Sequence, residues 1–328
     1  MIYRKEIDGL RALAIIPVVF SHLGTNILSG GFIGVDIFFV ISGYLITSII
    51  YEDFESGKFT LINFYERRIR RIIPALYLML IIFFIWVFIF WSPYDLRNVS
   101  QSVVATTFFA NNILLFLENN DYFAVFNNSN QINPLLHTWS LGVEEQFYIV
   151  YPIILFVFLK LKPKIIIYIL SFLFIFSLLI NVNQSNAIQN FYLPYARAWE
   201  LLLGSLAFYF FNYLKKKNID KFFISFGDIG FILIILSLFL FSNHFKLSSI
   251  FLILPTLGTF LIIISTNKSC LSYKFLSNKI VVFFGLISYS LYIWHLPIFA
   301  IFDYNLLSIP GGENKLNLFN ESMKLVCI

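Results

Sequence analysis

The sequence predicts an all-α fold, a polytopic membrane bundle of about nine to ten transmembrane helices with one additional re-entrant helix. Of 328 residues, 59% are hydrophobic and 12% are charged, whereas a soluble domain carries about 25% charged residues. Apolar runs of nearly membrane-spanning length recur from end to end. Lys and Arg gather in a few of the segments between these runs. These three observations exclude an ordinary soluble globular protein.

Nine segments are predicted to span the membrane. They are residues 10–28, 33–50, 72–91, 141–159, 164–181, 192–212, 222–242, 248–265 and 280–302. The basic segments between them are residues 3–5, 66–71, 160–164, 215–221 and 267–279. Because Lys and Arg favour the cytoplasmic side, we expect these segments and the N-terminus in the cytoplasm. The basic start lacks a small-residue cleavage site, so we interpret the first span as retained.

Residues 100–117, "SQSVVATTFFANNILLFL", are the exception to this alternation. We expect the loops before and after this segment to lie outside the cell, because the following span, 141–159, must end at the cytoplasmic basic segment 160–164. The segment contains Asn111, Asn112 and several hydroxyl groups, and it is only weakly apolar. We therefore predict a re-entrant or surface helix, which is tolerated at membrane depth only against protein or a wet cavity.

The chain ends in "ESMKLVCI", as though entering a further span, although eight residues cannot cross a bilayer. We therefore predict one membrane domain over residues 1–328 that ends at the start of its last helix. The two cysteines, Cys270 and Cys327, form no spaced motif. They indicate neither a disulfide framework nor a thiolate metal site, and we expect no metal cofactor.

Two polar residues mark the first span, "DGLRALAIIPVVFSH". Arg11 and His22 are eleven positions apart, so they share a helix face and lie ~16 Å apart along its axis. One interpretation is a boundary Arg that reaches the interface and a helix-end His bound by a neighbour. The alternative is a buried histidine that acts as a general base. Asp36, in the first turn of the next helix, is within plausible reach of His22 and could orient its ring.

The segment "FYERRIRRIIPA", residues 64–75, holds four arginines directly before a predicted span. Anchoring of the cytoplasmic end explains them well. The alternative is a phosphate clamp, because planar guanidinium groups bind phosphates in bidentate fashion. On the cytoplasmic side, an acyl-CoA would offer its 3′-phosphate and pyrophosphate to that clamp.

Acidic residues also lie within later spans. In "HTWSLGVEEQFYIVYP", Glu144 and Glu145 are adjacent, so at least one of the two faces the bundle. Arg197 and Glu200 lie three positions apart, which predicts an ion pair within one helix.

A polar stripe is predicted in the last span, "SYSLYIWHLP". Ser288, Tyr292 and His295 follow the spacing i, i+4, i+7, so they share one face. Each polar group in these spans could form a hydrogen bond between two helices. The number of such groups is larger than helix packing alone requires, and it indicates a polar pathway through the bundle.

Six segments resemble the acyltransferase-3 family of bacterial polysaccharide and peptidoglycan O-acetylases. They are "EIDGLRALAIIPVVFSH", "GGFIGVDIFFVISGYLIT", "FYERRIRRIIPA", "HTWSLGVEEQFYIVYP", "RAWELLLGS" and "SYSLYIWHLP", in the family's order over residues 3–302. The resemblance implies transfer of acetyl from cytoplasmic acyl-CoA to an external carbohydrate hydroxyl. It also implies ten membrane helices and a bacterial inner-membrane location. The Gly-Asp-Ser motif of the hydrolase-like domain that often follows in this family does not occur in this chain.

The resemblance also assigns expected roles to residues. Arg11 and His22 correspond to the family's Arg-x10-His pair, and Arg68 and Arg70 to its arginine motif near the donor. The predicted set is therefore catalytic His22, Arg11, Asp36 and Glu145; donor-binding Arg68, Arg70 and Arg71; and substrate-binding Glu144, Tyr292 and His295.

The expected donor is acetyl-CoA or another acyl-CoA. The expected partners are membrane lipids, a carbohydrate acceptor and a separate extracytoplasmic acyl-carrying protein, and no nucleic acid. A secondary transporter or lipid-linked saccharide flippase is the rival prediction, although we find no repeated, Gly/Pro-broken halves. A scaffold without chemistry would explain neither Arg11 nor His22. The acceptor sugar, the acyl length and the choice between a base and a transient acyl carrier stay open.

Overall fold

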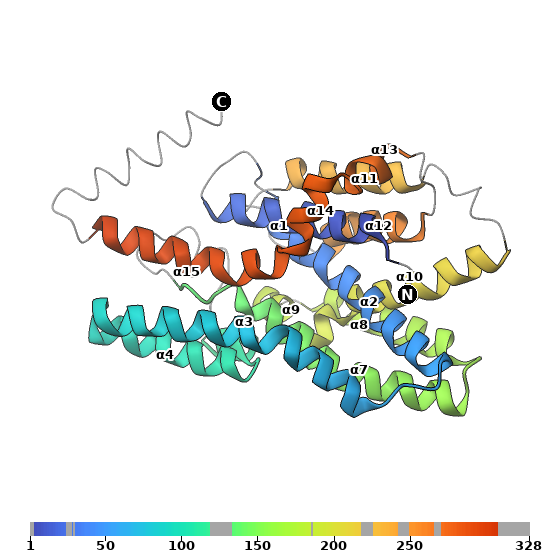
Figure 1. Cartoon of the computed structure of the whole chain (residues 1–328), viewed down its shortest axis with the longest axis horizontal. Helices are drawn as coiled ribbons and strands as arrows, with labels where there is room; N and C mark the ends of the chain where they lie inside the picture. The colour runs from blue at the N-terminus through green and yellow to red at the C-terminus, as the bar shows by residue number, and fades with distance from the viewer. Residues whose placement is uncertain are drawn as a thin grey trace.

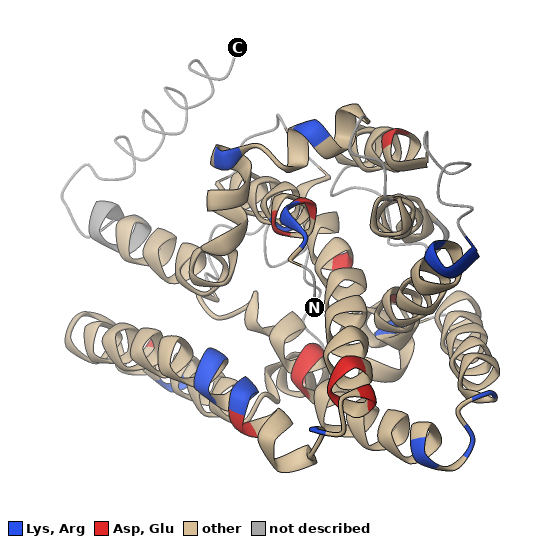
Figure 2. Cartoon of the chain, turned by 45° about the vertical axis from the view of Figure 1, so that its right-hand side comes forward, with Lys and Arg blue, Asp and Glu red and all other residues tan. Residues whose placement is uncertain are grey.

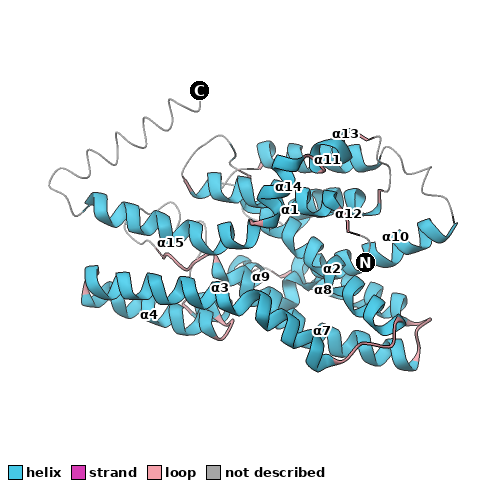
Figure 3. Ribbon diagram, viewed as in Figure 1, coloured by secondary structure: helices cyan, strands magenta, loops and turns pink. Residues whose placement is uncertain are grey.

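Helices account for all the regular secondary structure in the described part of this computed structural model (Figures 1 and 3). The structure describes residues 3–23, 28, 30–118, 133–184, 186–217, 226–241, 249–265 and 270–307. The predicted start of a last helix at 321–328 lies outside these residues. Parts of the predicted loops at 24–33, 215–221 and 267–279 also lie outside them.

The first half of the chain forms long antiparallel helices joined by short turns. Its elements are α1 (Lys5–His22), the 3-10 turn η2 (Gly31–Ile33), α2 (Gly34–Glu55), α3 (Leu61–Phe90), α4 (Pro93–Thr107) and α5 (Asn111–Leu117). The second half contains α7 (Thr138–Leu161), α8 (Ile166–Asn183), α9 (Ala187–Tyr192), α10 (Pro194–Lys217), α11 (Phe226–Leu240), α12 (Ser249–Ile264), α13 (Leu271–Leu276), α14 (Lys279–Leu286) and α15 (Ser288–Leu307).

The described part of each predicted span is largely helical, but not every helix is an uninterrupted apolar span. Within the described ranges, four are long and apolar enough to cross a membrane: η2 with α2, α3, α7 and α8. The predicted span at 280–302 is broken at Ile287, where α14 and α15 meet at a bend of 64°. Counting this bent pair as one span gives a fifth. The predicted span at 280–302 is therefore a bent pair of helices.

The predicted re-entrant segment is also interrupted. Helices α4 and α5 are separated by Phe108–Ala110, where Phe109 has a φ of 53°. Asn111 donates to the carbonyl oxygen of Leu135, and Asn112 donates to that of Tyr192, at 2.9 and 3.0 Å. The polar side chains of this segment are therefore bound to protein, as we expected of a polar segment among membrane helices.

Glycines bring the central helices into backbone contact. A Cβ on Gly43 of α2 would lie 1.8 Å from the carbonyl oxygen of Leu201 in α10. A Cβ on Gly285 of α14 would lie 1.8 Å from the carbonyl oxygen of Asp8 in α1. The second contact fixes the bend at Ile287 against the start of α1, and so it places the first turn of α15 beside Arg11.

The α2–α3 and α7–α8 connections lie together at the right of Figure 1, and Phe156 of α7 packs on both Phe54 and Phe59. Charged residues form isolated bands on otherwise uncharged helices (Figure 2).

Candidate active site

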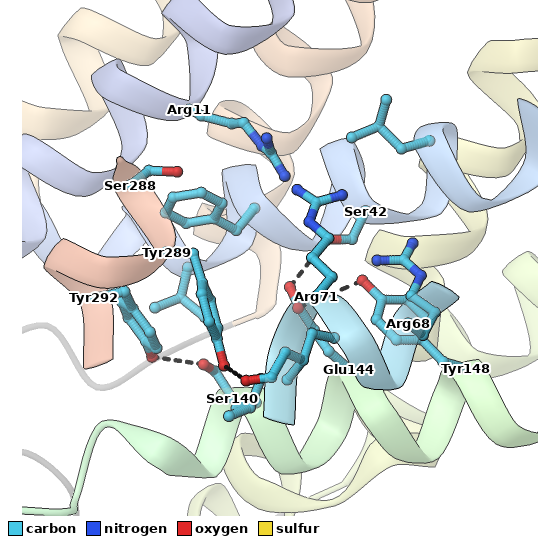
Figure 4. Close-up of a pocket in the computed structure, with 15 residues that line it drawn as sticks. Arg11, Ser42, Arg68, Arg71, Ser140, Glu144, Tyr148, Ser288, Tyr289 and Tyr292 are labelled. Atoms are coloured by element: carbon cyan, nitrogen blue, oxygen red, sulfur yellow. Dashed lines mark hydrogen bonds between the residues drawn. The ribbon is translucent and has the colours of Figure 1, made fainter. Parts of the chain in front are cut away.

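A pocket opens where α1, α2, α3, α7 and α15 converge (Figure 4). Its empty space, including open solvent at the mouth, is about 780 Å³. Its polar lining consists of Arg11, Ser42, Arg68, Arg71, Ser140, Glu144, Tyr148, Ser288, Tyr289 and Tyr292. The five helices come from opposite ends of the sequence, so only the tertiary fold forms this pocket.

Helix α3 supplies two arginines to the pocket from inside its own length. It begins at Leu61, eleven residues before the predicted span, because Thr60 caps it by accepting a hydrogen bond from the Asn63 amide. Arg68 and Arg71 are three positions apart on this helix, and both line the pocket.

Arg70 does not join them. Its side chain is 78% exposed and pairs with Glu66 at 2.7 Å. The structure therefore does not bring Arg70 into the pocket with Arg68. Residues three apart on a helix, such as 68 and 71, share a face, whereas residues two apart do not.

The guanidinium groups of Arg11, Arg68 and Arg71 gather on one side of the pocket (Figure 4). Arg11 lies 3.5 Å from Asp8. Among the described residues, no carboxylate lies within ion-pair distance of Arg68 or Arg71. This wall therefore presents positive charge that the chain itself only partly neutralises.

Glu144 faces the same pocket from α7. It accepts hydrogen bonds from Ser42 at 3.0 Å and from Tyr148 at 3.4 Å. The guanidinium of Arg68 lies over the Tyr148 ring, 4.6 Å from its centroid. Glu144 is thus held beside the arginines by neutral donors.

Glu145 also lies at the arginine end. The charges nearest to it are those of Arg68 and Glu144, and its Oε1 atom is buried without a hydrogen-bond partner. We predicted Glu145 as a catalytic residue together with His22, but the structure places it near Arg68 and Glu144.

Beyond Tyr292 and Ser140, which line the pocket, lies a cluster of histidines that are not themselves among its lining residues. The Tyr292 hydroxyl donates to the His137 carbonyl oxygen at 2.7 Å and lies 2.5 Å from the Ser140 hydroxyl. The Nδ1 atom of His22 lies 2.8 Å from Nε2 of His295. The rings of His137 and His295 pack edge to face with centroids 4.9 Å apart. Within the described ranges, no group of three or more His, Cys, Asp or Glu side chains is arranged to hold a metal ion.

The predicted contact between Asp36 and His22 is absent. Asp36 lies 2.5 Å from Arg197, which also pairs with Glu200 at 3.0 Å. The Arg197–Glu200 pair was predicted from its spacing and is confirmed. The Asp36 carboxylate binds the buried guanidinium of Arg197 and not the imidazole of His22, because the guanidinium supplies a full opposite charge and several N–H donors.

Comparison with known proteins now identifies the family. A family model described as an acyltransferase domain matches residues 4–319. The chain belongs to the acyltransferase-3 family. This membership does not favour the transporter or flippase alternative.

The acyltransferase-3 relatives include proteins with named activities. The chain is 36% identical to the O-acetyltransferase OatA of Staphylococcus aureus strain NCTC 8325, over 90% of this chain and 50% of that protein. It is 36% identical to the peptidoglycan O-acetyltransferase OatA of Listeria monocytogenes, over 91% and 50% of the two chains. A putative O-acetyltransferase of S. aureus strain MSSA476 is 34% identical, over 92% and 51%.

This acyltransferase-3 chain therefore spans about half the length of the curated relatives it matches. No solved structure matches it.

Some pocket residues of this acyltransferase-3 chain were missed at the level of sequence. Ser140 and Tyr148 are four positions before and after the predicted Glu144 on α7 and face the pocket with it, and that spacing was a usable signal. Ser42 and Tyr289 also line the pocket and were not predicted.

Proposed function

We propose that this chain is an O-acetyltransferase of the bacterial inner membrane. It transfers acetyl from cytoplasmic acetyl-CoA to a hydroxyl of an extracytoplasmic carbohydrate, of the peptidoglycan class that one relative's name states. The observation that carries this proposal is the pocket with an arginine wall on one side and a histidine cluster beyond Tyr292. The residues 1–328 act as one membrane domain in this proposal.

The arginine wall suits the phosphates of the donor. Arg68 and Arg71 have planar, permanently charged groups free of carboxylate partners among the described residues. Arg11 extends the same wall from α1. Charge-assisted hydrogen bonds from guanidinium to phosphate are among the strongest in proteins. The three side chains would hold the phosphates while the thioester extends toward the histidines.

His22 is the proposed base. It lies eleven residues after Arg11 on α1, a distance of ~16 Å along the helix axis. His22 accepts the proton of the acceptor hydroxyl as that oxygen attacks the thioester carbonyl carbon. The carbon–sulfur bond breaks, and the imidazolium returns the proton to the departing sulfur. Acetyl ester and free thiol are the two products.

Other predicted residues take supporting roles in this proposal. Tyr292 and Glu144 line the pocket, where they are proposed to bind the substrates. A separate extracytoplasmic acyl-carrying protein is a proposed partner of this chain.

The direct test supplies radiolabelled acetyl-CoA to membrane vesicles and measures label in glycan. We expect His22→Ala to reduce transfer by about 10²–10⁴-fold, the usual contribution of a general base. Ser21→Ala is the matched control, because Ser21 is adjacent but donates to the Val18 carbonyl oxygen. Near wild-type transfer by His22→Ala would reject His22 as the base.

The proposed orientation has its own test. In a background with Cys270→Ser and Cys327→Ser, Lys58→Cys and Ala187→Cys each add one exposed cysteine. A membrane-impermeant thiol reagent added outside should label position 187 and not position 58. The opposite pattern would place the N-terminus outside and reject a cytoplasmic donor.

A further inference from the structure

The hydrogen bonds around His295 define which of its nitrogens carries a proton. The Nδ1 atom of His295 lies 2.6 Å from the backbone carbonyl oxygen of Tyr292. A carbonyl oxygen can only accept, so Nδ1 of His295 is the donor and carries the hydrogen. A neutral imidazole has one N–H group, which leaves Nε2 of His295 as an acceptor.

His295 is best described as neutral in the resting protein. Its side chain is 5% exposed, and its contacts are the Tyr292 carbonyl, His22 and the rings of His137, Tyr292 and Phe299. None of these groups is a carboxylate. An unpaired buried cation is costly, so the neutral form is favoured.

This assignment extends to His22. Its Nδ1 atom lies 2.8 Å from Nε2 of His295, and the two ring planes are within 7° of parallel. Since Nε2 of His295 accepts, Nδ1 of His22 must donate. In neutral His22 the lone pair is then on Nε2, the nitrogen opposite the bond to His295.

A proline explains why the cluster is held on α15. Pro297 has no amide hydrogen, so the carbonyl of Ile293, four residues earlier, lacks its usual helical partner. His137 Nε2 lies 3.3 Å from that carbonyl oxygen and takes the place of the missing amide donor. The His137 ring then packs against the ring of His295, which restricts the orientation of His295.

We propose that His295 is a positioning residue that holds His22 in the tautomer whose Nε2 accepts the substrate proton. This inference rests on the proposed function, in which His22 is the base. When His22 takes the hydroxyl proton on Nε2, its Nδ1–H continues to donate to His295. The bond then becomes charge-assisted without any rearrangement of the two rings.

The tautomer can be measured without any substrate. The chain contains four histidines, so ¹⁵N-histidine labelling of the full chain in lipid nanodiscs gives few ring signals. Single His→Gln variants assign each signal by its loss. We expect His22 to carry hydrogen on Nδ1 and none on Nε2. A proton on Nε2 of wild-type His22, alone or with one on Nδ1, would overturn the inference.

Two variants then test the consequence for transfer. His295→Gln retains a carbonyl oxygen that can accept from His22, and it should stay within about tenfold of the wild-type kcat. His295→Leu removes the acceptor, and it should lower kcat by about 10–100-fold, as for a buried hydrogen-bonding group left unsatisfied. The KM for acetyl-CoA should not change. His22 in the Leu variant should show a mixture of tautomers.

The outcomes separate this inference from the proposed function. Full activity of His22→Ala rejects the base itself, whatever the tautomer. If His22→Ala is inactive while His295→Leu keeps both wild-type kcat and the wild-type tautomer, only the positioning role is rejected. If both His295 variants lose activity equally while His22 keeps its tautomer, His295 has a structural role and the inference also fails.

Discussion

Two clusters of arginine and carboxylate lie inside this bundle, and they differ in how completely their charges are paired. In the first, Arg197 binds both Asp36 and Glu200, and all three side chains are at most 3% exposed. In the second, Arg68 and Arg71 border an open pocket with no carboxylate at ion-pair distance among the described residues. The residue types are the same, but the environments are opposite.

The difference separates a structural role from a binding role. Arg197 is enclosed by the rings of Phe39, Trp139 and Phe191, with its charge centre 5.4 to 5.8 Å from their centroids. No pocket residue belongs to this closed cluster. The arginines of the pocket have space in front of them, so an anionic ligand can supply the missing partner.

The largest expected effect comes from breaking the closed cluster. Arg197→Leu leaves two buried carboxylates without their cation, and loss of one partner of a buried pair costs about 3–5 kcal/mol. We expect a large fall in the amount of folded protein and in its thermal unfolding temperature in detergent. Wild-type stability of Arg197→Leu would mean that the cluster is not structural.

The next largest effect should be on donor binding. Hydrogen bonds to charged groups contribute about 1.5–3 kcal/mol, so Arg68→Gln and Arg71→Gln should each raise the KM for acetyl-CoA by about 10–100-fold. Their unfolding temperatures should stay close to wild type, unlike that of Arg197→Leu.

Arg70→Gln is the matched control for this prediction, because Arg70 is exposed and paired with Glu66. Its KM should not change. An equal effect of all three substitutions would show that the arginines act only through general positive charge at the cytoplasmic side.

A smaller effect with the opposite sign is expected for Glu144→Gln. The variant keeps one carbonyl oxygen, which can accept from Ser42 or from Tyr148, but removes negative charge beside the arginines. Binding of a polyanionic donor should tighten by roughly twofold to tenfold, because one repulsive interaction is lost. Weaker donor binding would show that the Glu144 charge does not repel the donor.

The smallest predicted effect is salt dependence. Raising the ionic strength from about 0.01 to 0.15 M shortens the screening length from about 30 to 8 Å. The KM for acetyl-CoA should therefore rise modestly in wild type and less in the Arg68→Gln, Arg71→Gln double variant. Stability of the Arg197 cluster should not follow salt, since buried pairs are weakly screened. Equal slopes for both proteins would remove the arginine wall as the electrostatic site.

Local pattern was enough to predict much of the fold. Apolar runs located the helices, because a membrane helix must satisfy its backbone internally and its length is set by the bilayer. Spacing predicted the Arg197–Glu200 pair, because both residues lie on one helix with fixed geometry. The six segments of the family resemblance also depend only on residue order.

Partners from separate helices depended on tertiary packing. The sequence contained both Asp36 and His22, yet Asp36 binds Arg197 and His22 binds His295. Spacing along one helix cannot rank partners that arrive from another helix, because their approach is set by contacts such as Gly285 against Asp8.

The sequence could not predict whether Arg70 or Arg71 faces the pocket, for a similar reason. Which of them faces the pocket depends on the rotation that packing gives to α3. The bend at Ile287 likewise interrupts a segment that hydropathy treats as one span. Hydropathy measures the free energy of leaving water, and that quantity is the same for a straight helix and a bent one. Only the packing of α1 against α14 distinguishes the two, and with it the position of the histidine cluster.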